Sequence, residues 1–162
     1  TFARHYKTGE LIPRKYVDQL TNMRKYMAGY ASSRQLSFGY LDMMWHTIDI
    51  NEIDDIREAE QEVFSRFETM PVVKEACMST SFSHIFAGGY AAGYYGYKWA
   101  EMLEADAFSL FKEKGVMNKD IANKYVNTIL SQGGSKSAME MFKDFRGREP
   151  RIDALLERDG LK

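Results

Sequence analysis

The sequence has little of several features that usually identify a function at first sight. Its one cysteine, Cys77, excludes an intrachain disulfide and favours a reducing compartment. No apolar run approaches the roughly 20 residues that a membrane span needs. The 22 basic residues are balanced by 23 acidic ones, so no charge excess points to nucleic acid or to an anionic membrane. We therefore expect no nucleic-acid or membrane partner and a cytoplasmic location; because the chain starts at Thr1, a removed leader and the periplasm stay open.

Metal-ligating and phosphate-binding motifs are also missing. The only histidines are His5, His46 and His84, no two of which are four residues apart, so a His-Glu-x-x-His zinc motif is absent. No Gly-Lys-Ser/Thr follows Gly88-Gly89, which excludes a phosphate loop of the usual kind. Cys77 lies seven residues before His84 with no third group evident, which disfavours a cysteine nucleophile. We expect no metal site within this chain.

Helical periodicity dominates what remains, and we expect one all-α domain over residues 1–162. The apolar content of 44% is sufficient for a packed core. The segment 71–89 is expected to be irregular, apart from a short helical turn near Val72 to Cys77. Apolar spacing, caps, prolines and glycines predict helices over 14–30, 33–48, 54–67, 90–112, from Asn118 to Gly133-Gly134, from Ser135 or Ser137 to Phe145, and from Glu149-Pro150 to Gly160.

Two charged groups need a structural interpretation before a functional one. The acidic run from Asn51 to Glu62 lacks calcium-loop spacing, so we interpret it as a solvated helix face. Arg146 and Arg148 could bind a carboxylate ligand. A buried ion pair with Glu149 or with another helix explains them equally well.

The segment 82–104, FSHIFAGGYAAGYYGYKWAEMLE, combines tyrosine and glycine to an unusual degree. On one helix, Tyr90, Tyr94 and Tyr97 would fall within about 60° of one another, so their hydroxyls would share a stripe. Such stripes more often belong to a core. Here, however, small residues surround the tyrosines, which favours close approach of an extended peptide, and Gly88-Gly89 could act as a hinge. His84, just before them, suits hydrogen bonding to developing negative charge.

These residues resemble the thimet-oligopeptidase family of zinc metallopeptidases, whose bacterial members include oligopeptidases and peptidyl-dipeptidases. The resemblance covers essentially the whole chain. It rests on the string FSHIFAGGYAAGYYGYKWAEMLEADAF and on further blocks in family order: HYKTGELIP, LDMMWHT, ILSQGGS and FRGREPRIDALLERDGL.

The resemblance implies a helical C-terminal subdomain of a zincin-like oligopeptidase that lacks the zinc-binding helix. Zinc would be held by upstream residues of the full-length enzyme, so the chain alone is expected to be inactive. Its implied partners are short peptide substrates and the missing N-terminal portion of the same polypeptide.

The resemblance also implies roles for individual residues. Tyr97 is the candidate donor to the tetrahedral oxyanion opposite the zinc, and His84 and Tyr90 would hold the peptide backbone and assist that charge. Tyr94 matches another channel-facing tyrosine. Gly88 and Gly89 belong to a loop that moves to close on bound peptide.

Two alternatives stay open at this stage. One is the other activity of the family, in which a peptidyl-dipeptidase removes C-terminal dipeptides. The other is a helical module that retains a peptide-facing wall without catalysis.

Overall fold

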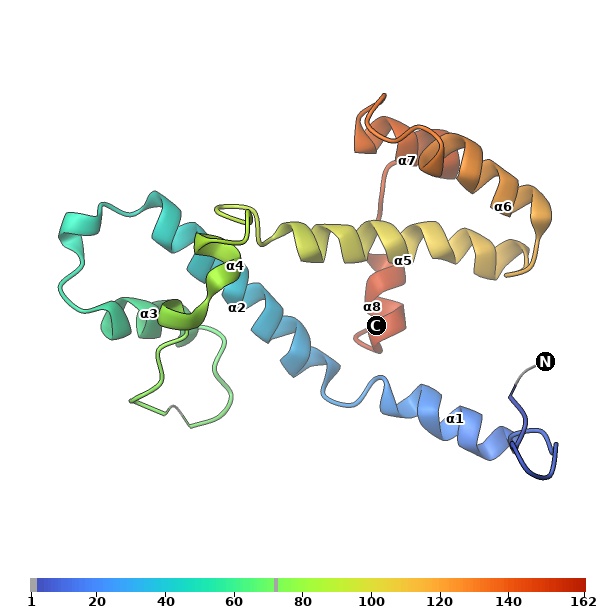
Figure 1. Cartoon of the computed structure of the whole chain (residues 1–162), viewed down its shortest axis with the longest axis horizontal. Coiled ribbons are helices and arrows are strands. Elements are labelled where there is room, and N and C mark those ends of the chain that lie inside the picture. Colours follow the sequence, from blue (N-terminus) through green and yellow to red (C-terminus); the bar gives the residue numbers. More distant parts are fainter. Residues whose placement is uncertain (1–2, 72) are drawn as a thin grey trace.

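The regular structure is helical throughout the part of the chain that the computed structural model describes, residues 3–71 and 73–162 (Figure 1). In this part there is no strand, only an isolated bridge between Arg4 and Leu11, which confirms the all-α expectation. The helices are α1 (Arg14–Met23), α2 (Ala28–Thr47), α3 (Ile56–Phe64), α4 (Ser83–Phe86), α5 (Gly96–Lys114), α6 (Lys119–Tyr125), α7 (Ala138–Arg146) and α8 (Asp153–Asp159), with short helical turns η1 (Ile50–Glu52), η2 (Ser79–Ser81) and η3 (Val126–Leu130).

Helix α5 connects two separate groups of helices (Figure 1). At its beginning lies a core formed by α2, α3 and α4, whose buried members are Phe38, Leu41, Phe82 and Ile85. Along its second half lies another core, in which Ala107 packs with Phe142 and Phe145 of α7, and Tyr125 of α6 lies against them.

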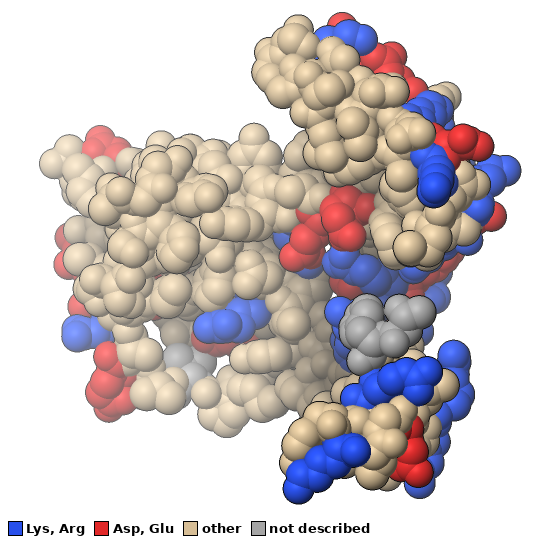
Figure 2. Space-filling view, turned by 45° about the vertical axis from the view of Figure 1, so that its right-hand side comes forward, with Lys and Arg blue, Asp and Glu red and all other residues tan. Residues whose placement is uncertain are grey.

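No helix in the described part of the chain is both long and apolar enough to span a bilayer. In the face shown in Figure 2, charged side chains gather over the two right-hand ends, whereas the broad part to their left carries few of them. The surface near the first core is thus mainly uncharged on this side.

Local capping explains where several helices begin. The side chain of Asn118 accepts hydrogen bonds from the amides of Asp120 and Ile121 at the start of α6. Ser137 forms a capping box with Glu140 at the start of α7. Of the two predicted starts, Ser135 and Ser137, the structure selects Ser137 because only Ser137 has a glutamate three residues later.

The predicted helix over 14–30 is wrong in its extent. Helix α1 ends at Met23, and α2 begins at Ala28 rather than at 33. Met27 between them has a φ of 55°, in the left-handed region, which interrupts the helix. The first element therefore turns, and its apolar row stays exposed instead of joining the core. The turn predicted near Val72 to Cys77 includes Val72, which lies outside the described residues; a single turn follows at 73–76.

The interpretation of the acidic run as a solvated helix face holds for its other carboxylates but is wrong at Glu60. Glu60 is only 5% exposed, and its carboxylate accepts hydrogen bonds from the amides of Met78 and Ser79 at 2.7 and 2.6 Å. The Ser79 hydroxyl, which also accepts a bond from Trp45, donates to the same carboxylate. Glu60 thus anchors the irregular segment that leads to α4.

The two arginines of the 146–148 motif bind a carboxylate of another helix, in agreement with the structural interpretation. Asp106 of α5 is 1% exposed; Arg148 donates to both of its oxygens at 2.6 and 2.7 Å. Arg146 and the backbone amide of Arg151 complete the set of donors. Glu149 instead pairs with Lys143. Burial alone would raise the pKa of Asp106, but these hydrogen bonds outweigh burial and lower it.

We predict that Asp106→Asn lowers the free energy of unfolding of the chain by about 3–5 kcal/mol, because it leaves the half-buried guanidinium groups of Arg146 and Arg148 without their buried counter-charge. The Asp106 pKa is lowered on folding, so its contribution is present above the ordinary value of 3.8 and is lost as pH falls through the lower folded-state value. Urea unfolding at neutral and acidic pH measures both effects.

The matched control is Asp144→Asn, which removes a surface pair with Lys136 whose side chains are 45% and 47% exposed. It should cost less than about 1 kcal/mol. An Asp106→Asn chain as stable as this control, or a difference from the unmodified chain that grows on acidification, would contradict the prediction.

Candidate functional site

Four aromatic side chains of the 82–104 segment gather on one side of the first core. We call His84, Tyr90, Tyr94 and Tyr97 the four-ring cluster. The ring centroids of Tyr90 and Tyr97 are 5.1 Å apart and nearly parallel, and those of Tyr94 and Tyr97 are 5.0 Å apart. His84 lies 6.1 Å from Tyr90 and 6.3 Å from Tyr94. The structure thus brings together all the predicted histidine and tyrosine site residues.

The backbone that carries these rings differs from the predicted helix over 90–112. Residues 91–95 form turns, and α5 begins only at Gly96. Ala92 has a φ of 51°, which no α-helix contains. The expected single stripe with Tyr90, Tyr94 and Tyr97 on one helix is therefore wrong. Only Tyr97 lies on α5, and the turn brings Tyr90 back beside it.

The carboxylate of Asp42 on α2 accounts for this turn. Its two oxygens accept hydrogen bonds from the amides of Ala92 and Tyr94, at 2.9 and 2.8 Å. His46, one helical turn along α2, places its Nδ1 2.9 Å from the same carboxylate. Asp42 is fully buried, so these bonds form in a site without competing water. The Ala92 amide, which could have formed a hydrogen bond within a helix, instead donates to a carboxylate 50 positions earlier in the chain.

Asp42 is not among the residues that the sequence patterns predict for the site. Its signal is the block LDMMWHT, in which a carboxylate adjoins the core residue Leu41 and lies four positions before a histidine. An aspartate on an apolar helix face requires hydrogen-bond donors. The sequence does not show which donors they are, because they come from a distant segment.

The two glycines before the cluster have different structural roles. A Cβ on Gly88 would lie 2.9 Å from the Cα and 3.0 Å from the carbonyl oxygen of His84, so no side chain fits there. Gly89 has a φ of 79°, which L-residues rarely adopt, and open space around it. Gly88 lets the backbone pass close to His84, and Gly89 makes the turn toward Tyr90.

The hydroxyl groups of the cluster differ in their surroundings. Tyr90 and Tyr97 are 40% and 39% exposed, whereas Tyr94 packs on Phe38 and Phe82 of the core. A hydrogen bond with Tyr90, followed by desolvation, raises the pKa of Tyr97. Burial raises the pKa of Tyr94, whose hydroxyl donates to Gln35 at 3.3 Å. Tyr90 and Tyr97 therefore form the exposed side of the cluster, and Tyr94 lies on its core side.

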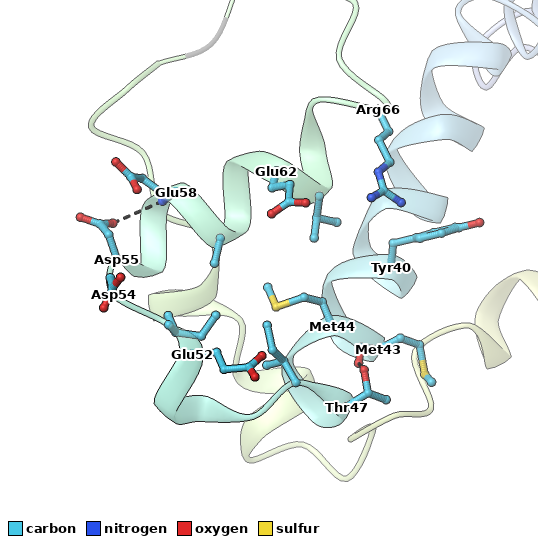
Figure 3. A pocket seen from close by; sticks show the side chains of 14 residues that line it. Tyr40, Met43, Met44, Thr47, Glu52, Asp54, Asp55, Glu58, Glu62 and Arg66 are labelled. Carbon is cyan, nitrogen blue, oxygen red and sulfur yellow. Dashed lines mark hydrogen bonds between the residues drawn. The ribbon is translucent and has the colours of Figure 1, made fainter.

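Two cavities lie elsewhere in the fold, and no ring of the cluster lines either of them. One, of about 550 Å³, lies between α2 and α3, where Met44 and several carboxylates surround it (Figure 3). The other, of about 640 Å³, is lined by residues of the 67–71 and 73–78 stretches and includes Cys77 in its wall. Cys77 faces Glu60 at 3.9 Å and has no imidazole partner that would activate it.

Metal-ligating side chains do not gather within residues 3–71 and 73–162. No three His, Cys, Asp or Glu side chains come together there as metal ligands would. The carboxylates around the cavity of Figure 3 point in different directions from its rim. The residues described thus offer hydrogen-bond donors rather than a metal centre.

The whole pattern matches known proteins. The model of Peptidase family M3 matches residues 1–161. Oligopeptidase A of Haemophilus influenzae is 45% identical over 158 residues, which are 97% of this chain and 23% of that protein. A probable cytosolic oligopeptidase A of Arabidopsis thaliana is 43% identical over 99% of this chain and 24% of its own length. Dipeptidyl carboxypeptidase of Escherichia coli is 34% identical, with 99% and 24% covered. The chain thus spans about a quarter of the length of these curated relatives.

We predict opposite results for alanine at two glycines of this segment. Gly88→Ala should destabilise the chain, because its Cβ would contact backbone atoms of His84 that cannot move independently. Gly96→Ala should be neutral or stabilising by up to about 1 kcal/mol, since Gly96 begins α5 with open space around it. Thermal unfolding of the two variants distinguishes them, and equal melting temperatures would contradict the close contact at Gly88.

We also predict that Tyr94 and Tyr97 keep their protons above pH 10.0, the ordinary tyrosine value. Their pKa values are raised, so the neutral form is favoured and deprotonation is delayed to higher pH. Ultraviolet difference titration of Tyr97→Phe against the unmodified chain isolates the missing group. A difference signal with its midpoint below pH 10.0 would mean that the pKa of Tyr97 is lowered, which would contradict the prediction.

Proposed function

Because this chain belongs to peptidase family M3, we propose that it forms part of a peptidase that hydrolyses short peptides. We further propose that this part supplies the side chains that bind the substrate and stabilise the charge formed on it. The single observation that supports this proposal best is the four-ring cluster, in which an imidazole and three phenol groups converge on one exposed side of the core.

The chemistry of peptide hydrolysis gives these groups distinct tasks. When water attacks a peptide carbonyl, negative charge develops on the carbonyl oxygen, and donors placed around that oxygen stabilise the transition state. Tyr97 is the proposed donor to this oxyanion. His84 and Tyr90, whose ring centroids lie 6.1 Å apart, are proposed to hydrogen-bond to the peptide backbone and to assist that charge. Tyr94, half-buried behind them, supports the ring of Tyr97.

Gly88 and Gly89 complete the proposed substrate-binding segment. Gly88 lets the backbone pass close to His84, and Gly89 has open space around it and a φ that L-residues rarely adopt. We propose that this loop closes over the bound substrate.

Peptidases of this family generally depend on zinc, which as a Lewis acid activates water for attack. The residues described here do not fit such a metal. We therefore propose that residues of the whole protein outside this chain hold the zinc. The chemistry assigned to this chain is carried by its histidine and tyrosine side chains.

The choice between two activities within the family is part of the proposal. We favour an oligopeptidase that cuts internal bonds, because identity to two proteins named oligopeptidase A is 43–45%. Identity to a protein named dipeptidyl carboxypeptidase is 34%. Release of C-terminal dipeptides is the alternative, and the masses of the products separate the two.

A non-catalytic peptide-binding module is the alternative from another class. It would keep the exposed cluster without the metal. A His-Glu-x-x-His motif encoded upstream of Thr1 would favour the enzyme. A start codon directly before Thr1 would favour the module.

We propose that the rest of the polypeptide packs on α1. This helix has no buried residue, yet its large apolar side chains recur at helical spacing and are 47–69% exposed: Tyr16, Leu20 and Met23. An apolar row of this kind is typical of a surface that another part of the molecule covers.

We propose the cytoplasm as the location, which the name of the probable cytosolic relative supports.

We predict that Tyr97→Phe in the whole protein lowers kcat for a short peptide by roughly 10²- to 10³-fold, the usual effect of losing one oxyanion donor. The ring and its stacking on Tyr90 are retained, so zinc content and stability should not change. Mass spectrometry of the products measures the rate and locates the cleaved bond.

The matched control is Tyr95→Phe, which removes a hydroxyl from the adjacent, 61% exposed tyrosine. It should retain full activity. The 162-residue chain assayed alone gives the background, which we expect to be zero. Full activity of Tyr97→Phe would remove Tyr97 from the mechanism, and no cleavage by the zinc-loaded unmodified protein would favour the binding module.

A further inference from the structure

We propose that Asp42 is a positioning residue of the four-ring cluster: its buried carboxylate holds the 91–95 turn and thereby sets where the hydroxyls of Tyr90 and Tyr97 point. This inference rests on the proposed function, because the cluster is assigned its task there. Asp42 itself lies beneath the turn and is fully buried, so it acts through the tyrosines and does not touch substrate.

The separation of Tyr90 and Tyr97 depends on the turn. In a continuous helix, two residues seven positions apart lie about 10 Å apart along the axis. Their ring centroids are instead 5.1 Å apart and stacked. The turn removes this rise and places the two hydroxyl groups side by side. A helix over this segment would break the pair.

Asp42 is the group that makes the turn favourable. The turn includes Ala92 with a φ of 51°, which is unfavourable for a residue with a Cβ. Two charge-assisted hydrogen bonds, from the amides of Ala92 and Tyr94, offset this cost. Helix α5 also has no side-chain cap of its own. The Asp42 carboxylate lies just before its first turn, where negative charge is stabilised.

His46 completes the environment of the carboxylate. Its Nδ1 lies 2.9 Å from Oδ1 of Asp42 and 2.8 Å from the Asp42 carbonyl oxygen. Its ring packs at 6.0 Å from Phe86 of α4. Both Asp42 oxygens are therefore engaged with donors, and the carboxylate cannot rotate without losing one. This fixed orientation is what a positioning residue requires.

The first test is Asp42→Asn in the whole protein, with amide hydrogen exchange followed by mass spectrometry. Asparagine keeps the size, but its NH₂ group faces an amide donor, so one hydrogen bond of the turn is lost. We expect exchange in the 90–95 segment to increase roughly 10-fold or more. We expect kcat to fall roughly 10- to 100-fold while KM changes little, since the displaced donors act on the transition state.

The matched control is Asp106→Asn, which removes another fully buried carboxylate, nine residues after Tyr97 on α5, where Arg146 and Arg148 bind it. It should loosen the surroundings of α7 and leave exchange in the 90–95 segment unchanged. Unchanged exchange in that segment for Asp42→Asn, or an increase spread uniformly over the chain, overturns the proposal.

A double-mutant cycle with Tyr97→Phe tests whether Asp42 acts through the cluster. In the Tyr97→Phe protein, Asp42→Asn should lower kcat by clearly less than in the unmodified protein. If the fold-changes in kcat of the two single variants simply multiply in the double variant, the two residues act independently and the proposal is overturned. If Asp42→Asn does not fold, Asp42→Glu replaces it. The longer side chain keeps the charge but shifts the turn, so unmodified kcat with glutamate overturns the proposal.

Hydrogen exchange also separates this inference from the proposed function. Full activity of Tyr97→Phe with fast exchange in Asp42→Asn would refute the oxyanion role and leave the anchoring of the turn intact. Slow exchange in Asp42→Asn with an inactive Tyr97→Phe would refute the anchoring alone.

Discussion

Buried carboxylates that bind backbone amides of distant segments determine how this chain is arranged. Asp42 holds the 92–94 amides, Glu60 holds those of 78–79, and Asp106 holds the amide of Arg151 together with two arginines. A charge removed from water is tolerated only when donors surround it. Each carboxylate therefore permits one placement of its partner segment. Apolar contacts alone would allow several placements.

These buried carboxylates explain how a fold with two small apolar cores can be ordered. Each core has few fully buried side chains, and the segments between them are irregular. The carboxylates supply the order that packing does not. Asp42 and Glu60 both bind backbone amides of the segment between α3 and α5. The candidate site lies largely in this segment.

Features encoded locally could be predicted from the sequence. Asn118 and Ser137 cap helices with residues two and three positions away, and Gly160 ends the last helix in a left-handed conformation. The all-α class follows from the same local signals. The break between α1 and α2 could not be predicted, because it depends on a positive φ at Met27 and methionine carries no sequence signal for that conformation.

The structure brings the predicted histidine and tyrosines of the candidate site together, but on a backbone that differs from the predicted helix. Tyrosine spacing suggested one helix, and a helix is what local periodicity favours over 90–112. The amides of Ala92 and Tyr94 bind a carboxylate 50 and 52 residues earlier, a relation that no local pattern contains. Glu60 escaped prediction for the same reason: its neighbours in sequence are solvated, and its partners are 18 and 19 residues away.

Helix α5 has a mechanical consequence for the tyrosines. Tyr97 lies in its first turn, and Asp106 lies nine residues later, about 13 Å along the same axis. Arg146 at the end of α7 and Arg148 just after it donate hydrogen bonds to Asp106 and so hold the helix there. An α-helix is stiff over this length, so a tilt of α5 at Asp106 would also move the Tyr97 ring against the rings of Tyr90 and Tyr94, which lie 5.1 and 5.0 Å away.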